Sequence, residues 1–225
     1  MDTLEARYRL LLDGLRRSAP DGGIRLLAVS KAQPAAAVRA LAALGQCAFG
    51  ENYVQEALAK QRELADLKLE WHLIGPLQSN KSREAARHFD WVQSVDRAKL
   101  LPLLDRERPA DRPALNVLLQ VNIDGEASKS GCAPEDVMAL AEAAAALPRL
   151  RLRGLMAIPE PHPDTAQRRA AFARMRALFE ALRERHPGCD TLSMGMSEDW
   201  PLALAEGATL IRVGSALFGA RPATP

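Results

Sequence analysis

The chain alternates between short apolar runs and longer stretches in which apolar residues recur every three or four positions. Leu4, Tyr8, Leu11 and Leu15 predict a leading amphipathic helix, which the segment 18–23 ends with proline and glycine. Eight apolar runs follow, each succeeded by helical spacing. The strands are predicted at 24–30, 46–50, 69–74, 91–94, 115–121, 150–158, 191–193 and 209–213, and the helices at 34–44, 80–88, 96–105, 134–147, 165–185, 198–206 and 215–218, with one more helix ending at 67.

Strands that alternate with helices predict a parallel sheet. Eight such units in about 200 residues predict an α/β fold. We expect a single (β/α)8 TIM barrel in one domain over 1–225, with an extra N-terminal helix over 1–19. An open doubly wound sheet is the alternative, but it normally has fewer strands, and the motif GxGxxG does not follow the first strand.

Composition and charge narrow the class of protein. Hydrophobic residues make up 48% and charged residues 26%, which excludes a disordered chain. The 30 basic and 28 acidic residues nearly balance, so neither nucleic acid nor a membrane surface is expected as a partner. Apolar stretches are shorter than a membrane span, and charges run through residues 1–18, so we expect neither an anchor nor a secretory signal. Three widely spaced cysteines predict a cytoplasmic protein without disulfides.

Polar residues and glycines follow the predicted strands, and the carboxyl ends of the strands form the functional face of a TIM barrel. Lys31 directly follows the first strand. Desolvation at the rim of an apolar core favours the neutral amine, which can form a Schiff base with an aldehyde or ketone. A lysine that only extends from a buried strand end to solvent is the alternative.

The loops after the last two strands predict an anion site. The segment 193–197 contains Gly195 and precedes a helix, while Gly214 and Ser215 follow the eighth strand. Glycines let a phosphate approach the backbone closely, and phosphate sites in TIM barrels frequently use these two loops. Two ordinary turns with helix-capping serines are the alternative.

Arg212 and His72 lie within predicted strands. Burial of the Arg212 guanidinium is costly unless it is paired, either with a ligand atom or with a carboxylate such as Glu51. His72 is a candidate general base, although a single histidine in a strand is more often structural. The histidine, cysteine and acidic residues lack the spacing of metal ligands, so no metal site is expected.

Eight segments spread over the chain carry a family resemblance. They are LLAVSK (26–31), FGENYVQEA (49–57), WHLIGPLQSNK (71–81), QSVDR (93–97), LLQVNIDGEASKSG (118–131), RGLMAI (153–158), LSMGMSEDW (192–200) and IRVGSALFGAR (211–221). Through them the sequence resembles the pyridoxal phosphate homeostasis protein family, which has a fold-type III barrel similar to the N-terminal domain of alanine racemase.

The resemblance implies that pyridoxal 5′-phosphate (PLP) is the cofactor and that Lys31 carries it as a Schiff base. It places the cofactor phosphate against the last two loops, and Arg212 at the pyridine nitrogen. Asn52 would lie beside the ring, and Met156, at the end of the sixth strand, would line the same site. The residues expected to bind the cofactor are Lys31, Asn52, Met156, Ser193, Gly195, Met196, Ser197, Arg212, Gly214 and Ser215.

Binding is expected rather than strong catalysis. A guanidinium stays protonated, so Arg212 would leave the pyridine ring uncharged, and an uncharged ring is a weak electron sink. Racemases of this fold use a second acid–base group from an added domain, for which a barrel of 225 residues leaves no sequence. The expected function is therefore intracellular PLP homeostasis, linked indirectly to amino-acid and keto-acid balance.

Two enzymatic alternatives stay open, a PLP-dependent amino-acid racemase or lyase and a cofactor-free aldolase that uses Lys31. The expected partners are PLP and, as recipients, apo PLP enzymes, with a monomer as the default state. Spacing does not decide whether Lys81 or Lys129 offers a second PLP site.

Overall fold

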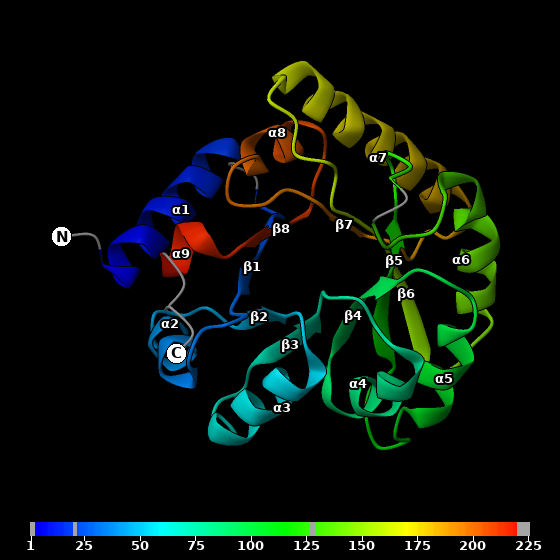
Figure 1. Cartoon of the computed structure of the whole chain (residues 1–225), viewed down its shortest axis with the longest axis horizontal. Coiled ribbons are helices and arrows are strands. Elements are labelled where there is room, and N and C mark those ends of the chain that lie inside the picture. Colours follow the sequence, from blue (N-terminus) through cyan, green and yellow to red (C-terminus); the bar gives the residue numbers. More distant parts are fainter. Residues whose placement is uncertain (1–2, 20–21, 127–128, 220–225) are drawn as a thin grey trace.

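Eight parallel strands close into a barrel in the order of the sequence, and β1 also pairs with β8. The structure is a computed structural model that describes residues 3–19, 22–126 and 129–219. Helices surround the ring of strands (Figure 1), which confirms the α/β barrel. The strands are β1 (Arg25–Val29), β2 (Ala48–Glu51), β3 (Glu70–Leu73), β4 (Trp91–Val95), β5 (Leu115–Val121), β6 (Leu150–Ala157), β7 (Thr191–Ser193) and β8 (Leu210–Val213).

The helices follow the predicted order with small shifts at their ends. Two of them are preceded by a turn of 3₁₀ helix, η1 (Ser79–Lys81) and η2 (Pro134–Asp136). The fifth α-helix starts later than its apolar spacing predicts, and the preceding loop is held by Arg97, which donates to the Leu77 carbonyl at 2.9 Å. The α-helices are α1 (Leu4–Ser18), α2 (Ala35–Ala43), α3 (Val54–Glu63), α4 (Ser82–His88), α5 (Leu100–Glu107), α6 (Val137–Ala145), α7 (Thr165–Arg185), α8 (Trp200–Ala205) and α9 (Ser215–Phe218).

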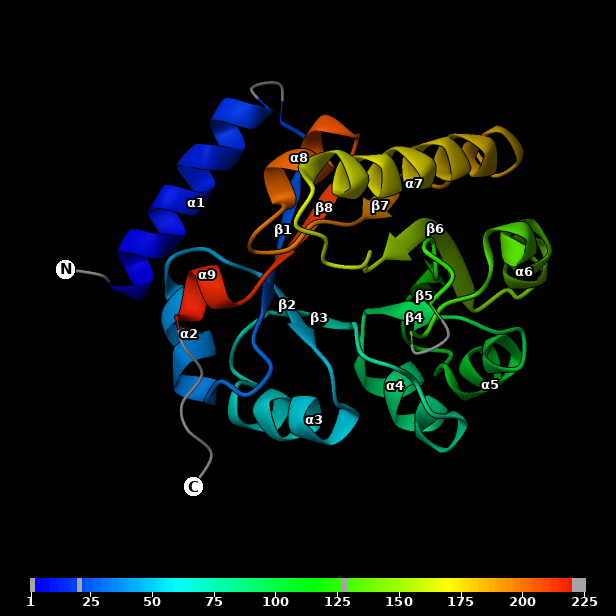
Figure 2. The same ribbon diagram turned by 45° about the horizontal axis from the view of Figure 1, so that its top comes forward.

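The leading helix α1 packs outside the barrel, beside α9 and α2 (Figure 2). The Thr3 hydroxyl accepts a hydrogen bond from the backbone N–H of Ala6 and so caps the first turn. Tyr8, Leu11 and Leu15 are buried on one face of the helix. The predicted helix over 1–19 is thus confirmed from Leu4 to Ser18, while residues 1 and 2 lie outside the described ranges.

Alternate residues of each strand face the barrel interior and the surrounding helices. In β1, Leu26 and Ala28 belong to the main core under the helices, whereas Leu27 and Val29 belong to a separate cluster inside the barrel. Continuation of this alternation puts Lys31 on the interior side, at the carboxyl end of the strand. The strand period therefore decides which polar residues can reach the mouth of the barrel.

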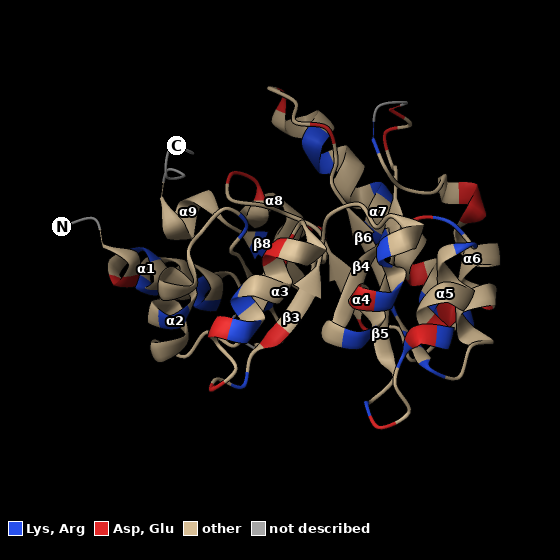
Figure 3. Ribbon diagram, turned by 60° about the horizontal axis from the view of Figure 1, so that its bottom comes forward, with Lys and Arg blue, Asp and Glu red and all other residues tan. Residues whose placement is uncertain are grey.

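Charged side chains of both signs are interspersed over the outer helices (Figure 3). Helices α3 and α5, for example, each carry basic and acidic residues side by side, in keeping with a net charge of only +2. Within the described ranges, no helix combines the length and the apolar character needed to cross a membrane.

Candidate functional site

A cavity of about 990 Å³ opens at the carboxyl ends of the strands. Its lining comes from β1, β5 and β8, from the loops after β1, β2, β3, β5, β6, β7 and β8, and from the first turns of α7 and α9. Seven of the ten residues expected from the sequence line it, namely Lys31, Asn52, Met196, Ser197, Arg212, Gly214 and Ser215. The charged lining residues are four basic ones and two acidic ones, Lys31, Lys129, Arg168, Arg212, Glu198 and Asp199. This positive balance suits an anionic ligand.

The other three expected residues lie behind the lining. Met156 is fully buried and packs with Trp91 and Leu118 inside the barrel. Ser193 is also fully buried, beneath Arg212. Gly195 has φ +89°, and a Cβ there would come within 2.6 Å of the Ala203 Cβ. These residues can support the cavity wall, but they do not form its surface.

The turn that carries Lys31 is held on both sides of the lysine. The Ser30 backbone N–H donates to the Gly50 carbonyl at 3.0 Å, and the Ser30 carbonyl accepts from Lys60 Nζ at 2.6 Å. On the other side, the Ala32 N–H donates to Glu56 Oε1 at 2.6 Å. Ala32 has φ +59°, a conformation that residues other than glycine seldom adopt. The hydrogen bonds from α3 therefore fix an unfavourable turn directly beside the amine.

Behind this turn lies an ion cluster made of buried Glu51 and Lys60 and partly exposed Glu56. Lys60 Nζ contacts Glu51 Oε1 at 2.7 Å and Glu56 Oε1 at 2.8 Å. The Ser30 hydroxyl also donates to Glu51 Oε1, at 2.6 Å. Burial raises the pKa of Glu51, although the Lys60 charge opposes the shift. Glu51 Oε1 is thus committed to Lys60 and Ser30, whereas the buried Oε2 has no hydrogen-bond partner among the described residues.

Arg212 is buried inside the barrel and is held by neutral acceptors. Its Nη1 donates to the Ser193 carbonyl and hydroxyl, both at 2.8 Å, and its Nη2 donates to the Ala157 carbonyl at 2.8 Å. The expected alternative of an ion pair with Glu51 is wrong. Residues of β2 alternate, with Ala48 on the interior side and Phe49 in the core under the helices, so Glu51 faces the helices rather than Arg212.

The guanidinium keeps hydrogen-bonding capacity for a ligand. Burial lowers the pKa of Arg212 to about 10, which leaves the group charged at neutral pH. A guanidinium has five N–H donors. Three of these N–H groups donate to protein acceptors, which leaves two without a protein acceptor on a residue that lines the cavity.

The two candidate phosphate loops follow adjacent strands and lie side by side at the mouth. The backbone N–H of Ala216 donates to the Ser197 hydroxyl at 3.4 Å. The Met196 N–H donates to Asp199 Oδ1 at 2.6 Å and so shapes the turn after β7. A Cβ at Gly214 would come within 3.2 Å of the Val29 carbonyl oxygen. The loop after β8 therefore packs closely against the end of β1, which brings Ser215 towards the strand that leads to Lys31.

The remaining candidate residues, His72, Lys129 and Lys81, differ in whether they line the cavity. His72 is fully buried in β3 and does not line the cavity, so the structural interpretation fits it better than the role of general base. Lys129 lines the cavity and lies 3.7 Å from Glu126, whereas Lys81 lies in η1, outside the lining. Positions 127 and 128 of the segment 118–131 lie outside the described residues.

Sequence reasoning missed the residues that support the site from behind. Lys60 was not singled out in the sequence, and its buried partner Glu51 comes from β2. Gln93 marked the end of a strand but had no assigned role, and its contact with Ser193 joins residues 100 positions apart. The scarcity of lysine, six among 30 basic residues, was the one signal pointing to Lys60.

The barrel, with a lysine after its first strand and two neighbouring loops after its last two strands, belongs to the class of alanine racemase N-terminal domains. The family model for the alanine racemase N-terminal domain matches residues 2–222. The chain is 58% identical over 226 residues to a pyridoxal phosphate homeostasis protein of Pseudomonas aeruginosa, with 98% of this chain and 97% of the relative covered. An Escherichia coli relative with the same description is 51% identical over 201 residues, with 88% and 86% covered.

A solved structure points the same way. PipY from Synechococcus elongatus, solved with PLP bound, is 46% identical and superposes with a TM-score of 0.84, covering 96% of this chain and 100% of PipY. The chain belongs to the pyridoxal phosphate homeostasis protein family.

Proposed function

We propose that this protein binds PLP in the barrel cavity, holds it covalently on Lys31 and takes part in PLP homeostasis. The observation that carries the proposal is that Lys31, Arg212 and the two neighbouring loops line one cavity with a positive balance of charge. The relatives in Pseudomonas aeruginosa and Escherichia coli are described as PLP homeostasis proteins, and the PipY structure contains PLP. When bound, PLP supplies an aldehyde that bonds reversibly to an amine.

Each part of the cavity has a role in this proposal. Lys31 provides the amine, and the hydrogen bonds on either side of it fix the turn from which it extends. Ser197, Gly214 and Ser215 bind the phosphate through hydroxyl and backbone N–H groups. Arg212 donates to the ring nitrogen. Of the other expected residues, Asn52 and Met196 line the cavity and contact the cofactor, while Met156, Ser193 and Gly195 support the wall from behind.

We also propose that the chain acts as one domain and as a monomer in the cytoplasm, where it passes PLP to apo enzymes. The three cysteines are free thiols, which suits a reducing compartment. The positive cavity suits a ligand that carries phosphate, and a covalent bond to an amine can be exchanged for another amine when a recipient takes the cofactor.

Absorption spectroscopy tests the proposal. Wild-type protein incubated with PLP is expected to turn yellow and to lose its visible band on borohydride reduction, with the reduced adduct on Lys31 in peptide mass spectra. Lys31→Ala is expected to remove the adduct with little change in Tm. Lys129→Ala, another lysine of the same cavity, serves as the matched control and is expected to keep the Lys31 adduct.

Two results would contradict the proposal. Wild-type protein that takes up no PLP would exclude a PLP function. A reducible cofactor retained in Lys31→Ala would exclude Lys31 as the attachment site.

A further inference from the structure

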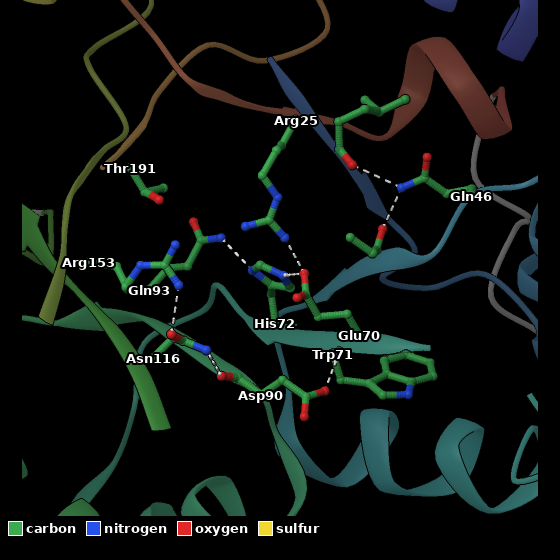
Figure 4. Close-up of polar contacts among 12 residues, drawn as sticks. Arg25, Gln46, Glu70, Trp71, His72, Asp90, Gln93, Asn116, Arg153 and Thr191 are labelled. Carbon is green, nitrogen blue, oxygen red and sulfur yellow. Dashed lines mark hydrogen bonds and ion pairs between the residues drawn. The ribbon is translucent and has the colours of Figure 1, made fainter. Parts of the chain in front are cut away.

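A line of polar side chains crosses the barrel interior below Arg212. The Ser193 hydroxyl accepts from Arg212 Nη1 at 2.8 Å and lies 2.7 Å from Gln93 Oε1. Gln93 Nε2 lies 2.8 Å from His72 Nδ1, and His72 Nε2 lies 2.7 Å from Glu70 Oε1. The line runs through β8, β7, β4 and β3 and ends where Arg25 in β1 donates to Glu70. Figure 4 shows the half from Gln93 to Arg25.

The chemistry of the two ends gives every hydrogen bond in the line one direction. A guanidinium can only donate and a carboxylate can only accept. The Ser193 hydroxyl, which accepts from Arg212, therefore donates to Gln93 Oε1, and the Gln93 amide donates to His72 Nδ1. Burial lowers the pKa of His72, which favours the neutral ring that this arrangement needs. The remaining ring proton then lies on Nε2 and is donated to Glu70.

The middle of the line is shielded from solvent and held rigidly. Ser193, Gln93 and His72 are each 0% exposed. The His72 ring stacks on Trp91 with 5.1 Å between centroids and 7° between planes. Arg25 and Arg153 each lie over the Trp91 ring, at 5.0 and 4.7 Å from its centroid. In such an interior a misdirected or missing hydrogen bond is costly, so the orientation of each group depends on its neighbour.

We propose that Gln93 and His72 are positioning residues for Arg212, which they hold through Ser193 in the orientation that presents its remaining N–H groups to the cofactor. The inference rests on the proposed PLP function. It extends the site to the opposite end of the barrel, where Glu70 and Arg25 line a separate cavity between α1 and the start of the strands.

The alternative is that the line only satisfies polar groups in the core. That role and the positioning role differ in what happens to bound PLP. A purely structural line affects the free energy of unfolding alone. A positioning line also affects the absorption band of bound PLP, because the band reports the electronic environment of the conjugated ring that Arg212 contacts.

Gln93→Leu removes the central link with a side chain of similar size. We expect PLP to bind about tenfold more weakly, the size of effect expected when a charged hydrogen-bonding group loses its orientation. We also expect the visible band of the bound cofactor to shift. Ser193→Ala deletes a single hydroxyl and is expected to change both readouts in the same direction. If Gln93→Leu fails to fold, Ser193→Ala tests the proposal by the same two measurements, the PLP dissociation constant and the band position.

Ser94→Ala controls for a change beside Gln93, and Gln46→Leu controls for loss of stability. Ser94→Ala removes a buried hydroxyl next to Gln93 in β4 that lies outside the line. Gln46→Leu removes a buried amide that bonds the Leu26 and Ala48 carbonyls. Gln46→Leu loses its two hydrogen bonds to backbone carbonyls and is expected to lower Tm. The Ser94 hydroxyl has no hydrogen-bond partner among the described residues, so Ser94→Ala is expected to change Tm little. Both variants are expected to keep the PLP dissociation constant within about twofold and the band unmoved.

The outcomes separate the two proposals. If wild-type protein binds PLP but Gln93→Leu and Ser193→Ala match it in dissociation constant and band position, the positioning role is overturned and the proposed function stands. If wild-type protein binds no PLP, the proposed function itself fails.

Discussion

Lys60 and Arg212 are both buried cations, but their surroundings differ in kind. Lys60 contacts two carboxylates, Glu51 and Glu56, and one carbonyl. Arg212 contacts two carbonyls and a hydroxyl, and forms no ion pair with any residue in the described part of the chain. The negative charge of Asp199 raises the pKa of Arg212 but only partly offsets the lowering caused by burial.

The difference indicates that a buried cation paired with carboxylates serves the fold, whereas a buried cation held by neutral acceptors is available to a ligand. A cation that is neutralised by carboxylates inside the protein has little charge left for a ligand, and it stabilises the fold. A cation held only by dipoles keeps its charge, at a cost in stability that a bound anion or ring nitrogen can offset. On this view Lys60 fixes the turn of Lys31, and Arg212 acts on the ligand.

The largest expected effect is the loss of unfolding free energy when Lys60 is replaced. Lys60→Met leaves Glu51 buried without its cation, and breaking a buried pair in this way costs about 3–5 kcal/mol. The deficit should grow with rising pH, because an unpaired buried carboxyl favours its protonated form. Urea unfolding of the ligand-free protein measures it. Lys68→Met, at an exposed position, is the control. An equal loss of unfolding free energy in both variants would show that the buried ion pairs of Lys60 do not stabilise the fold.

The next effect is on ligand binding. Arg212→Met is expected to weaken PLP binding about 10- to 100-fold, the range for loss of charged hydrogen bonds. The acceptors left unpaired are expected to lower the free energy of unfolding by about 1–3 kcal/mol. Spectroscopic titration beside thermal melts separates the two quantities. Arg168→Met removes a positive charge from the same cavity and should weaken binding less. If both arginine variants lose the same affinity, total cavity charge rather than Arg212 governs binding.

The smallest effect concerns pH at the far end of the interior line. Burial would raise the pKa of Glu70, but the hydrogen bond from His72 and the charge of Arg25 outweigh it and lower the pKa from 4.5 to about 2. Because the folded pKa is depressed, this stabilisation is complete above pH 4.5 and is lost as pH falls towards about 2. The Arg25 and Glu70 side chains are more than a third exposed, so solvent screens their interaction. The stabilisation from Glu70 then amounts to about 1 kcal/mol.

Glu70→Gln should therefore flatten the dependence of unfolding free energy on pH within that window. Glu63→Gln, at an exposed position in α3, is the control and should leave the slope as in the wild type. An unchanged slope in Glu70→Gln would show that the carboxyl does not carry the acid sensitivity.

The parts of the site that follow from position along a strand could be predicted from the sequence. Lys31 and Arg212 belong to apolar runs with a period of two, so their place at the barrel mouth follows from strand geometry. The strands and most helices are also local patterns, which is why their bounds differ only slightly. α7 matches its predicted range, Thr165–Arg185.

The supporting contacts could not be predicted, because they join residues brought together only by closure of the barrel. Gln93 and Ser193 meet across the interior, and Lys60 meets Glu51 between a helix and a strand. Glu51 lies two positions after Phe49, so it shares the face of β2 that packs under the helices, where Lys60 of α3 meets it. The suggested Arg212–Glu51 pair failed for this reason.

The register between β1 and β8 pairs Leu27 with Arg212. During synthesis on a ribosome, the amine of Lys31 is made with the first strand, whereas Arg212 and the loop of Gly214 and Ser215 are made with the last. A growing chain that lacks β8 holds the lysine without the groups that would recognise a phosphate or a ring. Under the proposed function, recognition of the phosphate and ring therefore begins only after translation of β8, and the earlier strands fold without help from the ligand.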